Sequence, residues 1–247
     1  MYDTLTLVTV FSAFVIAGAV KGVLGLGLPT VALGLLTATI DLPTAMSLQL
    51  VPALATNFWQ AATGGFGLVI LVRIWPFLLT ATVTIWLGST ALGFVSLSLL
   101  SMLLGALLVI YSVLSLMGVR ATIKNRQEVW VGPLAGATNG LLTGMTGSSV
   151  IPGVMYLQSI GLPRDMLVQA MGFLFTVSTV SLGMALYGRN LLSVELGTLS
   201  VAALVPAAVG MVIGQRIRSV LSEIVFQRVM LVSLIILGCY IIGTAIL

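Results

Sequence analysis

Residues Gly18 to Pro29 read GAVKGVLGLGLP, and Leu42 to Gln49 read LPTAMSLQ. The chain repeats the main features of both stretches, as GATNGLLTGMTGSSVIP at residues 136–152 and LPRDMLVQ at residues 162–169. Gly-Ala-x-x-Gly recurs 118 residues on, and Leu-Pro-x-x-Met-x-x-Gln recurs 120 residues on. A duplicated apolar unit broken by glycine and proline is typical of secondary transporters. The sequence therefore predicts two repeats of one membrane unit.

The composition indicates whether this chain lies in water or in a membrane. Hydrophobic residues make up 59% of it and charged residues 6%, and the mean hydropathy is +1.22. A soluble domain carries roughly a quarter charged residues, so we expect a polytopic membrane protein. Its long apolar segments favour helices over the alternating strands of a barrel. The chain has no histidine and one cysteine, Cys239, which argues against an enzyme, a metal site or a cofactor.

We expect an all-α polytopic membrane protein of two inverted repeats, residues 1–118 and 130–247, joined by a cytoplasmic linker at residues 119–129. Each repeat would hold a glycine-broken hairpin or short-helix pair plus three transmembrane helices. Two apolar segments are short for a helical span, and the sequence leaves open whether they are re-entrant or full crossings. These two are Gly27–Ile40 and Ser148–Ile160. The other expected segments are Leu5–Val23, Leu42–Gln60, Pro76–Phe94, Leu97–Met117, Trp130–Gly147, Leu162–Tyr187, Leu196–Ile213 and Val225–Ile246.

Loop charges distinguish inverted from parallel repeats. If each glycine-broken pair starts and ends on one side of the membrane, a cytoplasmic linker leaves one basic loop residue outside, Arg189. If the short arms instead dip from the far side, the repeats are parallel and the same residues divide five against three. Cytoplasmic loops carry an excess of Lys and Arg, so we expect inverted repeats with both termini outside the cytoplasm. The residues then expected inside are Arg73, Arg120, Lys124, Arg126, Arg164, Arg216 and Arg218.

The two breaks are the expected substrate site. Interrupted helices of inverted-repeat transporters meet near the bilayer midplane, and N–H groups at helix ends attract anions. The polar side chains there can all donate hydrogen bonds, and no carboxylate lies near the tips in sequence, which suits an oxyanion better than a cation. The expected substrate-binding residues are Lys21, Gly25, Gly27, Gln49, Asn57, Asn139, Thr143, Thr146, Gly147, Ser148, Ser149 and Gln169.

Each group of these residues also has a purely structural alternative. The spacings Gly18-x-x-x-Gly22 and Gly136-x-x-x-Gly140 allow membrane helices to approach closely. Lys21 lies near the end of its segment, where long cationic side chains reach the membrane interface. The amide side chains can serve as interhelical hydrogen bonds, worth about 1 kcal/mol each. The sequence alone leaves these alternatives open.

Together, these residues resemble the sulfite exporter TauE/SafE family, also called the toluene-sulfonate uptake permeases. The resemblance rests on the doubled unit and on residues 210–217, GMVIGQRI, followed by Leu221-Ser222-Glu223, which are similar to the family's penultimate helix and basic loop. It covers nearly the whole chain. The breaks Gly25-Leu26-Gly27 and Thr146-Gly147-Ser148-Ser149 lack the fuller glycine runs common in the family, which leaves the substrate open. The resemblance implies transport of sulfur-containing or organic anions such as sulfite, sulfoacetate or other sulfonates.

The membrane potential favours one direction of transport. An inside-negative potential of about 100 mV favours the exit of a singly charged anion by about 2.3 kcal/mol, a concentration ratio of roughly 50. We therefore expect export by alternating access from a multi-pass protein of the cell (inner) membrane. An anion channel and an ion-coupled uptake permease are the alternatives. The expected partners are a small anionic substrate and the lipid bilayer, with no nucleic acid, and a homo-oligomer is compatible with this interpretation.

Overall fold

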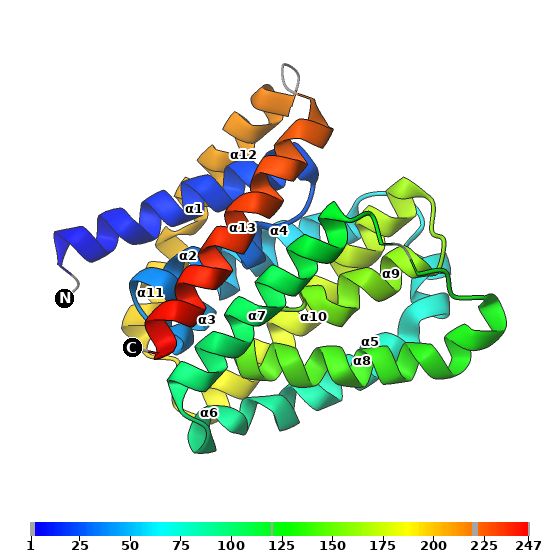
Figure 1. Cartoon of the computed structure of the whole chain (residues 1–247), viewed down its shortest axis with the longest axis horizontal. Helices are drawn as coiled ribbons and strands as arrows, with labels where there is room; N and C mark the ends of the chain where they lie inside the picture. Colours follow the sequence, from blue (N-terminus) through cyan, green and yellow to red (C-terminus); the bar gives the residue numbers. More distant parts are fainter. Residues whose placement is uncertain (1–2, 120, 219–221, 247) are drawn as a thin grey trace. The chain divides into compact units, whose positions relative to one another are not determined.

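The computed structural model describes residues 3–119, 121–218 and 222–246. Every element of regular secondary structure in these ranges is helical, as expected (Figure 1). Six helical segments there are long and apolar enough to cross a membrane, so the protein is a multi-pass helical membrane protein. The elements are α1 (Thr4–Leu24), α2 (Leu28–Thr39), α3 (Leu42–Leu48), α4 (Leu50–Ala62), α5 (Gly67–Ser89), α6 (Ala91–Phe94), α7 (Leu97–Leu116), α8 (Asn125–Thr146), η1 (Val150–Val154), α9 (Met155–Ser159), α10 (Arg164–Gly188), α11 (Val194–Ala202), α12 (Leu204–Arg218) and α13 (Glu223–Ile246).

Short polar residues cap the first turns of α1 and α3. The Asp3 carboxylate accepts a hydrogen bond from the Thr6 amide at 3.1 Å and caps α1. Hydrogen bonding to Thr6 holds the pKa of Asp3 below its usual value. The Asp41 carboxylate caps α3 through the Thr44 amide at 2.8 Å, and Pro43 occupies the first turn. Proline is tolerated there because the first amides of a helix have no intrahelical acceptor.

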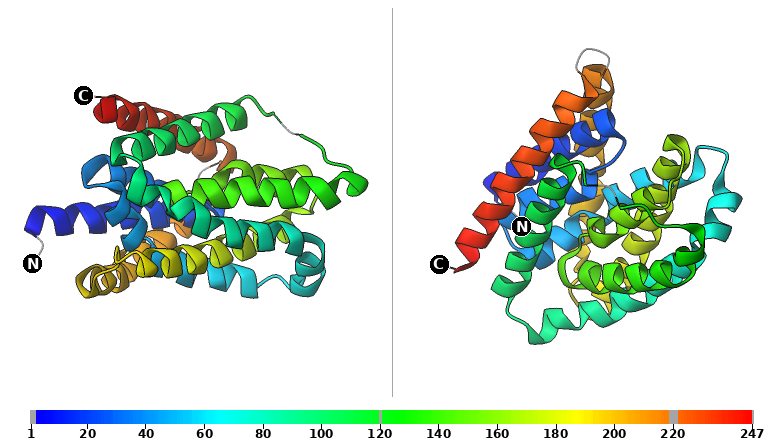
Figure 2. Two further views of the ribbon diagram at one scale, coloured as in Figure 1. Left: turned by 90° about the horizontal axis from the view of Figure 1, so that it is seen from below. Right: turned by 45° about the vertical axis from the view of Figure 1, so that its right-hand side comes forward.

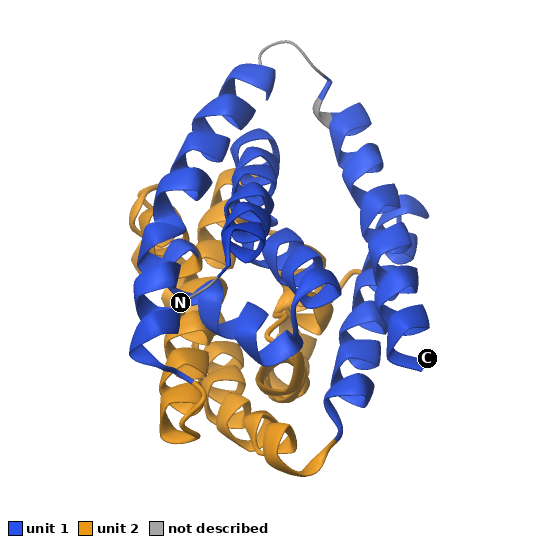
Figure 3. Cartoon of the chain, turned by 90° about the vertical axis from the view of Figure 1, so that its left-hand side faces the viewer, with its two compact units in different colours: residues 1–52, 96–118, 192–247 blue, residues 53–95, 119–191 orange. Residues whose placement is uncertain are grey.

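The chain forms two compact units (Figure 3). Unit 1 comprises Met1–Pro52, Ser96–Gly118 and Leu192–Leu247, and unit 2 comprises Ala53–Val95 and Val119–Leu191. Each unit therefore takes helices from both predicted repeats. The division into repeats at residues 1–118 and 130–247 stays a prediction about the sequence.

In unit 1, α1 lies along α12 through close backbone contacts at glycines. Gly18 faces the Ala207 carbonyl and Gly22 faces the Met211 carbonyl, and a β-carbon at either glycine would overlap that oxygen. Gly214 of α12 faces the Ala19 carbonyl of α1 in the same way. These glycines act in helix packing, as their small-residue spacing allows.

In unit 2, α8 lies along α5 through matching contacts, and Figure 2 shows the two helices side by side. Gly140 faces the Ala81 carbonyl and Gly144 faces the Ile85 carbonyl. In the other direction, Gly88 of α5 faces the Leu141 carbonyl of α8. The same three-contact arrangement therefore occurs once in each unit.

These contacts correct the register of the two copies. Gly140 and Gly144 follow Gly18 and Gly22 by 122 residues, whereas the shared Gly-Ala-x-x-Gly pattern aligns them at 118. The difference is one helical turn. It arises because α8 has glycines at residues 136, 140 and 144, so that a spacing of four matches α1 in two ways. The partner carbonyls distinguish the two alignments, and the glycines that end the two helices, Gly25 and Gly147, are also 122 residues apart.

Several predicted helix bounds were wrong. The segment expected at Pro76–Phe94 begins at Gly67, with Pro76 inside α5; prolines are tolerated in membrane helices where neighbours satisfy the freed backbone groups. The segment expected at Leu42–Gln60 is interrupted at Gln49 between α3 and α4. The segment expected at Leu196–Ile213 is interrupted between α11 and α12. Residues 125–129 of the predicted linker already belong to α8.

Two contacts mark opposite ends of α5 in unit 2. The Arg73 guanidinium, which we expected in a loop, pairs with both carboxylate oxygens of Glu128 at 2.9 and 2.6 Å and donates to the Ile160 carbonyl at 2.7 Å. At the other end, Arg189 Nε donates to Ser89 Oγ at 3.0 Å. Sixteen residues separate Arg73 from Ser89, about 24 Å at the rise of an α-helix. That length approaches the thickness of a bilayer's hydrocarbon core, about 30 Å.

Candidate functional site

The first break, in unit 1, joins α1 to α2. Gly25 ends α1 in the left-handed conformation, φ 75°, and its amide donates to the Lys21 carbonyl at 2.8 Å. Gly27 then begins α2, with Pro29 in the first turn. The Lys21 side chain is 5% exposed. Lys21 is therefore buried by the protein rather than extended away from it, and its substrate-binding role stays a prediction.

The second break, in unit 2, joins α8 to η1. Gly147 ends α8 with φ 76°, and its amide donates to the Thr143 carbonyl at 2.7 Å. The Thr146 hydroxyl donates to the Leu142 carbonyl at 2.7 Å and accepts from the Ser148 amide at 3.3 Å. The Thr146 side chain is fully buried. The chain therefore leaves the helix through a turn that its own side chains stabilise.

A cluster of hydroxyls fills the inside of this turn. The Thr143 hydroxyl lies 3.0 Å from the Ser149 hydroxyl, 2.7 Å from the Asn139 carbonyl and 3.2 Å from the Ser148 carbonyl. Ser148 and Ser149 are 4% and 8% exposed, and Thr143 is 1% exposed. The structure therefore brings together five of the predicted site residues in unit 2, Asn139, Thr143, Thr146, Ser148 and Ser149, around Gly147.

The side-chain amide oxygen of Asn139 is hydrogen-bonded, and its amide nitrogen is available. Its Oδ1 accepts a hydrogen bond from the Gly153 amide at 3.0 Å, where a β-carbon on residue 153 would crowd the same oxygen. Its Nδ2 has no hydrogen-bond partner among the described residues, and the side chain is 0% exposed. A buried donor without a partner is costly in a protein interior, so this group is a candidate for binding a ligand acceptor.

The amide residues outside the breaks behave differently from one another. Gln169 Nε2 donates to the Ala61 carbonyl at 2.8 Å, and its Oε1 accepts from the Phe66 amide at 3.0 Å. Both ends of that side chain therefore hold α10 to the turn between α4 and α5. Gln49, in unit 1, is 3% exposed, and Asn57, in unit 2, is fully buried. Their substrate-binding roles, and a shared site for Gln49 and Gln169, stay predictions.

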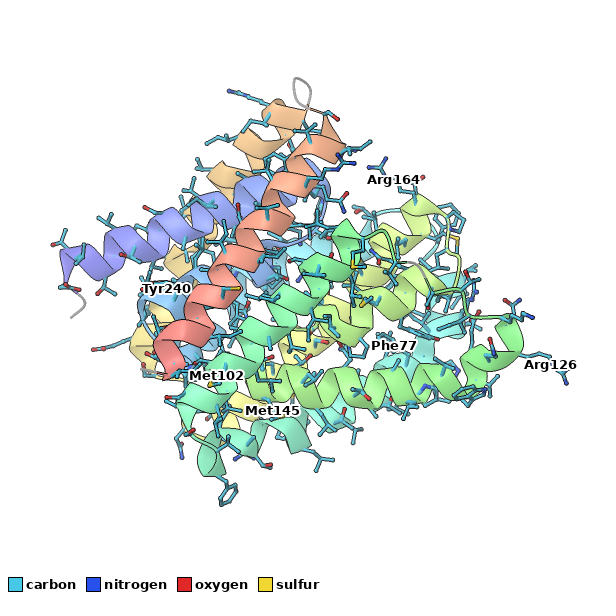
Figure 4. All side chains as sticks on the ribbon, viewed as in Figure 1. Phe77, Met102, Arg126, Met145, Arg164 and Tyr240 are labelled. Atoms are coloured by element: carbon cyan, nitrogen blue, oxygen red, sulfur yellow. The ribbon has the colours of Figure 1, made fainter. Side chains whose placement is uncertain are left out.

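The second arm, formed by η1 and α9, is held from outside the break. The Phe77 and Tyr156 rings stack with centroids 4.7 Å apart, and Figure 4 marks Phe77 on α5. Arg73 and the Ile123 amide bind the carbonyls of Ile160 and Ser159 at the far end of α9. The sequence analysis missed this role of Arg73, because its partners Glu128 and Ile160 lie far from it in the sequence. Among the described residues, no three His, Cys, Asp or Glu side chains cluster as a metal site would require.

These features define a class of protein before any comparison is made. The apolar helices, the paired glycine-terminated helices and the buried donors around one of the breaks are those of a multi-pass membrane transporter. The family model for the sulfite exporter TauE/SafE family matches residues 10–241. The chain therefore belongs to the TauE/SafE sulfite exporter family, a family of membrane transporters and not of enzymes. Arg120 and Leu221, named in the sequence analysis, lie outside the described residues. Searches of curated proteins and of solved structures gave no match.

Proposed function

We propose that this protein is a secondary transporter that exports small sulfur-containing oxyanions, with sulfite, sulfoacetate and related sulfonates as the substrate class. The family supplies the coarse function. The observation that carries the finer proposal is the Nδ2 group of Asn139, a fully buried donor with no hydrogen-bond partner among the described residues. An oxyanion offers acceptors to such a donor, and a cation does not.

The surroundings of Asn139 support the same chemistry. Thr143 has one hydroxyl hydrogen, which can go to the Asn139 carbonyl, the Ser148 carbonyl or the Ser149 hydroxyl. When Thr143 donates to Ser149, the Ser149 hydroxyl hydrogen is left for a bound acceptor. Lys21 adds a buried cationic side chain at the corresponding break of unit 1. Neutral donors bind an anion less tightly than a cluster of cations would, and a transporter must release what it binds. We therefore propose a substrate-binding role for Asn139 and the hydroxyls around Gly147 in unit 2, and a separate one for Lys21 in unit 1.

Export is the direction that the membrane potential favours. A potential of about 100 mV, negative inside, contributes about 2.3 kcal/mol to the exit of each negative charge. That free energy sustains an outward concentration ratio of roughly 50 without a coupled ion. The proposed mechanism is alternating access by inverted repeats, with both termini outside the cytoplasm. Glu128 contacts α5 near one end and Arg189 contacts it at the other. This placement supports a cytoplasmic linker with Arg189 on the opposite side of the membrane.

Flux through purified protein in liposomes tests this proposal. Vesicles loaded with radiolabelled sulfite should release it with saturable kinetics, faster when the interior is made negative with a potassium gradient and valinomycin. Vesicles carrying Asn139→Asp should release it more slowly, and protein-free vesicles set the leak. Flux that rises linearly with sulfite concentration would indicate a channel instead. Absence of flux for sulfite, sulfoacetate and other sulfonates would refute the substrate class.

A further inference from the structure

The interruption between α3 and α4 has a cause in the sequence. Gln49 separates the two helices, with α3 ending at Leu48 and α4 beginning at Leu50. In a continuous helix the amide of residue 52 would donate to the carbonyl of Leu48. Residue 52 is proline, which has no amide hydrogen. The helical hydrogen-bond ladder therefore fails at Leu48, one residue before Gln49.

Ser200 of α11 replaces the lost bond. Its hydroxyl donates to the Leu48 carbonyl at 2.8 Å and accepts from the Val51 amide at 3.1 Å. A single hydroxyl can do both, since it has one hydrogen and two lone pairs. Ser200 is 1% exposed, and all these residues belong to unit 1. Buried backbone groups without a partner are strongly disfavoured, so this hydroxyl stabilises the interrupted form of the helix.

We propose that Ser200 is a positioning residue for Gln49: by holding the backbone on both sides of Gln49, it fixes the direction in which the Gln49 amide meets the transported anion. This inference rests on the proposed function and, in addition, on the predicted substrate-binding role of Gln49. Interrupted helices form the substrate sites of many secondary transporters. Gln49 is 3% exposed and lies directly between the two groups that Ser200 binds. Ser200 acts through the backbone and does not contact the substrate.

Sulfite titration of purified full-length variants tests the inference. Ser200→Ala should lower sulfite affinity about five- to tenfold, the loss expected when one ligand hydrogen bond is displaced, and Ser200→Thr should recover most of it by keeping the hydroxyl. The matched control is Ser181→Ala. Ser181 is 2% exposed, and its hydroxyl donates to the Thr82 carbonyl at 3.0 Å, also between two helices. This control should bind sulfite as the wild type does.

A double-mutant cycle shows whether Ser200 acts through Gln49. Ser200→Ala should cause no further loss of affinity in a Gln49→Ala background, and in the single mutant the Val51 amide should exchange its hydrogen faster than in Ser181→Ala. The inference would be overturned if the affinity losses of Ser200→Ala and Gln49→Ala add in the double mutant. It would also be overturned if Ser200→Ala binds sulfite like the wild type while Gln49→Ala binds it more weakly. If Ser200→Ala does not fold, Ser200→Cys replaces it in the same cycle, since a thiol is a weaker donor. If Gln49→Ala binds sulfite like the wild type while Asn139→Asp binds it more weakly, this inference is overturned and the proposed function stands. If both variants bind sulfite like the wild type, the proposed substrate-binding role of Asn139 is refuted as well.

Discussion

Gly25 and Gly147 end their helices with the same left-handed backbone geometry. Gly25 has φ 75° and ψ 3°, and Gly147 has φ 76° and ψ −4°. Each amide donates to the carbonyl four residues earlier, which belongs to Lys21 in one case and to Thr143 in the other. Glycine adopts this conformation without the steric cost that other residues incur. The two caps and the glycine contacts behind them agree on one register for the two copies.

This register gives the two breaks different chemistry at one structural position. An offset of 118 residues, as in the Gly-Ala-x-x-Gly pattern, would pair Lys21 with Asn139, but the caps pair Lys21 with Thr143. The first copy thus carries a lysine where the second carries a hydroxyl that bonds to Ser149. Asn139 lies one turn earlier on α8 and has no lysine counterpart. We infer that Lys21 and Asn139 do not occupy equivalent positions in the two copies: the charged donor of one copy and the neutral amide donor of the other lie one helical turn apart in the shared register.

Replacing Asn139 with aspartate tests the neutral donor. The change keeps an oxygen to accept from Gly153 and replaces the Nδ2 donor with an oxygen. An ionised aspartate repels the anion and donates nothing to it, so we expect sulfite affinity to fall at least about tenfold. Isothermal titration of detergent-purified protein measures this change, and size-exclusion chromatography checks that the variant stays folded.

The matched control is Asn125→Asp, the same substitution at the exposed first residue of the same helix. It makes the same change of net charge far along α8 from Asn139. We expect it to bind sulfite as the wild type does. Equal affinities for wild type, Asn125→Asp and Asn139→Asp would show that Asn139 does not contact the substrate.

Gln169 is tested against its neighbour Gln60. Gln169→Ala removes two hydrogen bonds to the backbone of Ala61 and Phe66, so we expect the free energy of unfolding to fall by roughly 2 kcal/mol. Gln60→Ala removes one bond across the same contact, to the Val168 carbonyl at 2.7 Å, and should cost about 1 kcal/mol. Denaturant or thermal unfolding in detergent measures both.

Sulfite titration of these two variants then separates packing from binding. A loss of affinity in Gln169→Ala that Gln60→Ala does not share would support the predicted ligand role of Gln169. Equal affinities, with both variants destabilised, would assign Gln169 to helix packing. Unchanged stability in Gln169→Ala would show that the two backbone bonds contribute little.

The sequence was sufficient for features that local chemistry controls. Apolar length predicted the membrane helices, and the segment expected from Leu42 starts where α3 starts. Gly25 and Gly147 were correctly expected at helix breaks because few residues besides glycine accept that backbone conformation. The family resemblance was confirmed by the match over residues 10–241.

Features that depend on distant partners were beyond the sequence. Pro52 predicts a lost hydrogen bond at Leu48, but nothing in the local sequence shows that Ser200, 152 residues away, replaces it. Arg73 belongs to a helix because Glu128 neutralises it, a pairing that no local pattern contains. The register of the two copies was ambiguous for the same reason, since evenly spaced glycines are distinguished by the carbonyls they contact.

Accessibility of single cysteines tests the membrane topology. In a Cys239→Ser background, cysteines at Asp41 and Arg189 should react with an impermeant maleimide in intact cells, while cysteines at Lys124 and Arg126 should react only after permeabilisation. Cys239 is replaced because it is exposed. The prediction follows from the positive-inside rule and from the separation of about 24 Å between the two ends of α5. Labelling of Lys124 from outside would refute inverted repeats with external termini.

Lys21 provides the last prediction, because it places a cation inside the protein at the first break. A charge buried within a membrane costs about 2.5–3.5 kcal/mol on insertion scales, and a lysine that served only solubility would extend to the interface instead. Lys21 is 5% exposed. If Lys21 is a substrate ligand, as we propose, a bound anion offsets part of that cost.

We therefore expect Lys21→Gln to remain folded and to lose most of its sulfite affinity, at least about tenfold. Lys21→Arg should keep part of that affinity, since it retains the charge but changes the donor geometry. Lys124→Gln is the matched control, because Lys124 is the only other lysine of the chain and is exposed. Sulfite titration at several salt concentrations measures all three: affinity should decline with salt in the wild type and depend on it much less in Lys21→Gln. Wild-type affinity and salt dependence in Lys21→Gln would leave Lys21 with a structural role and remove the charge from the proposed site.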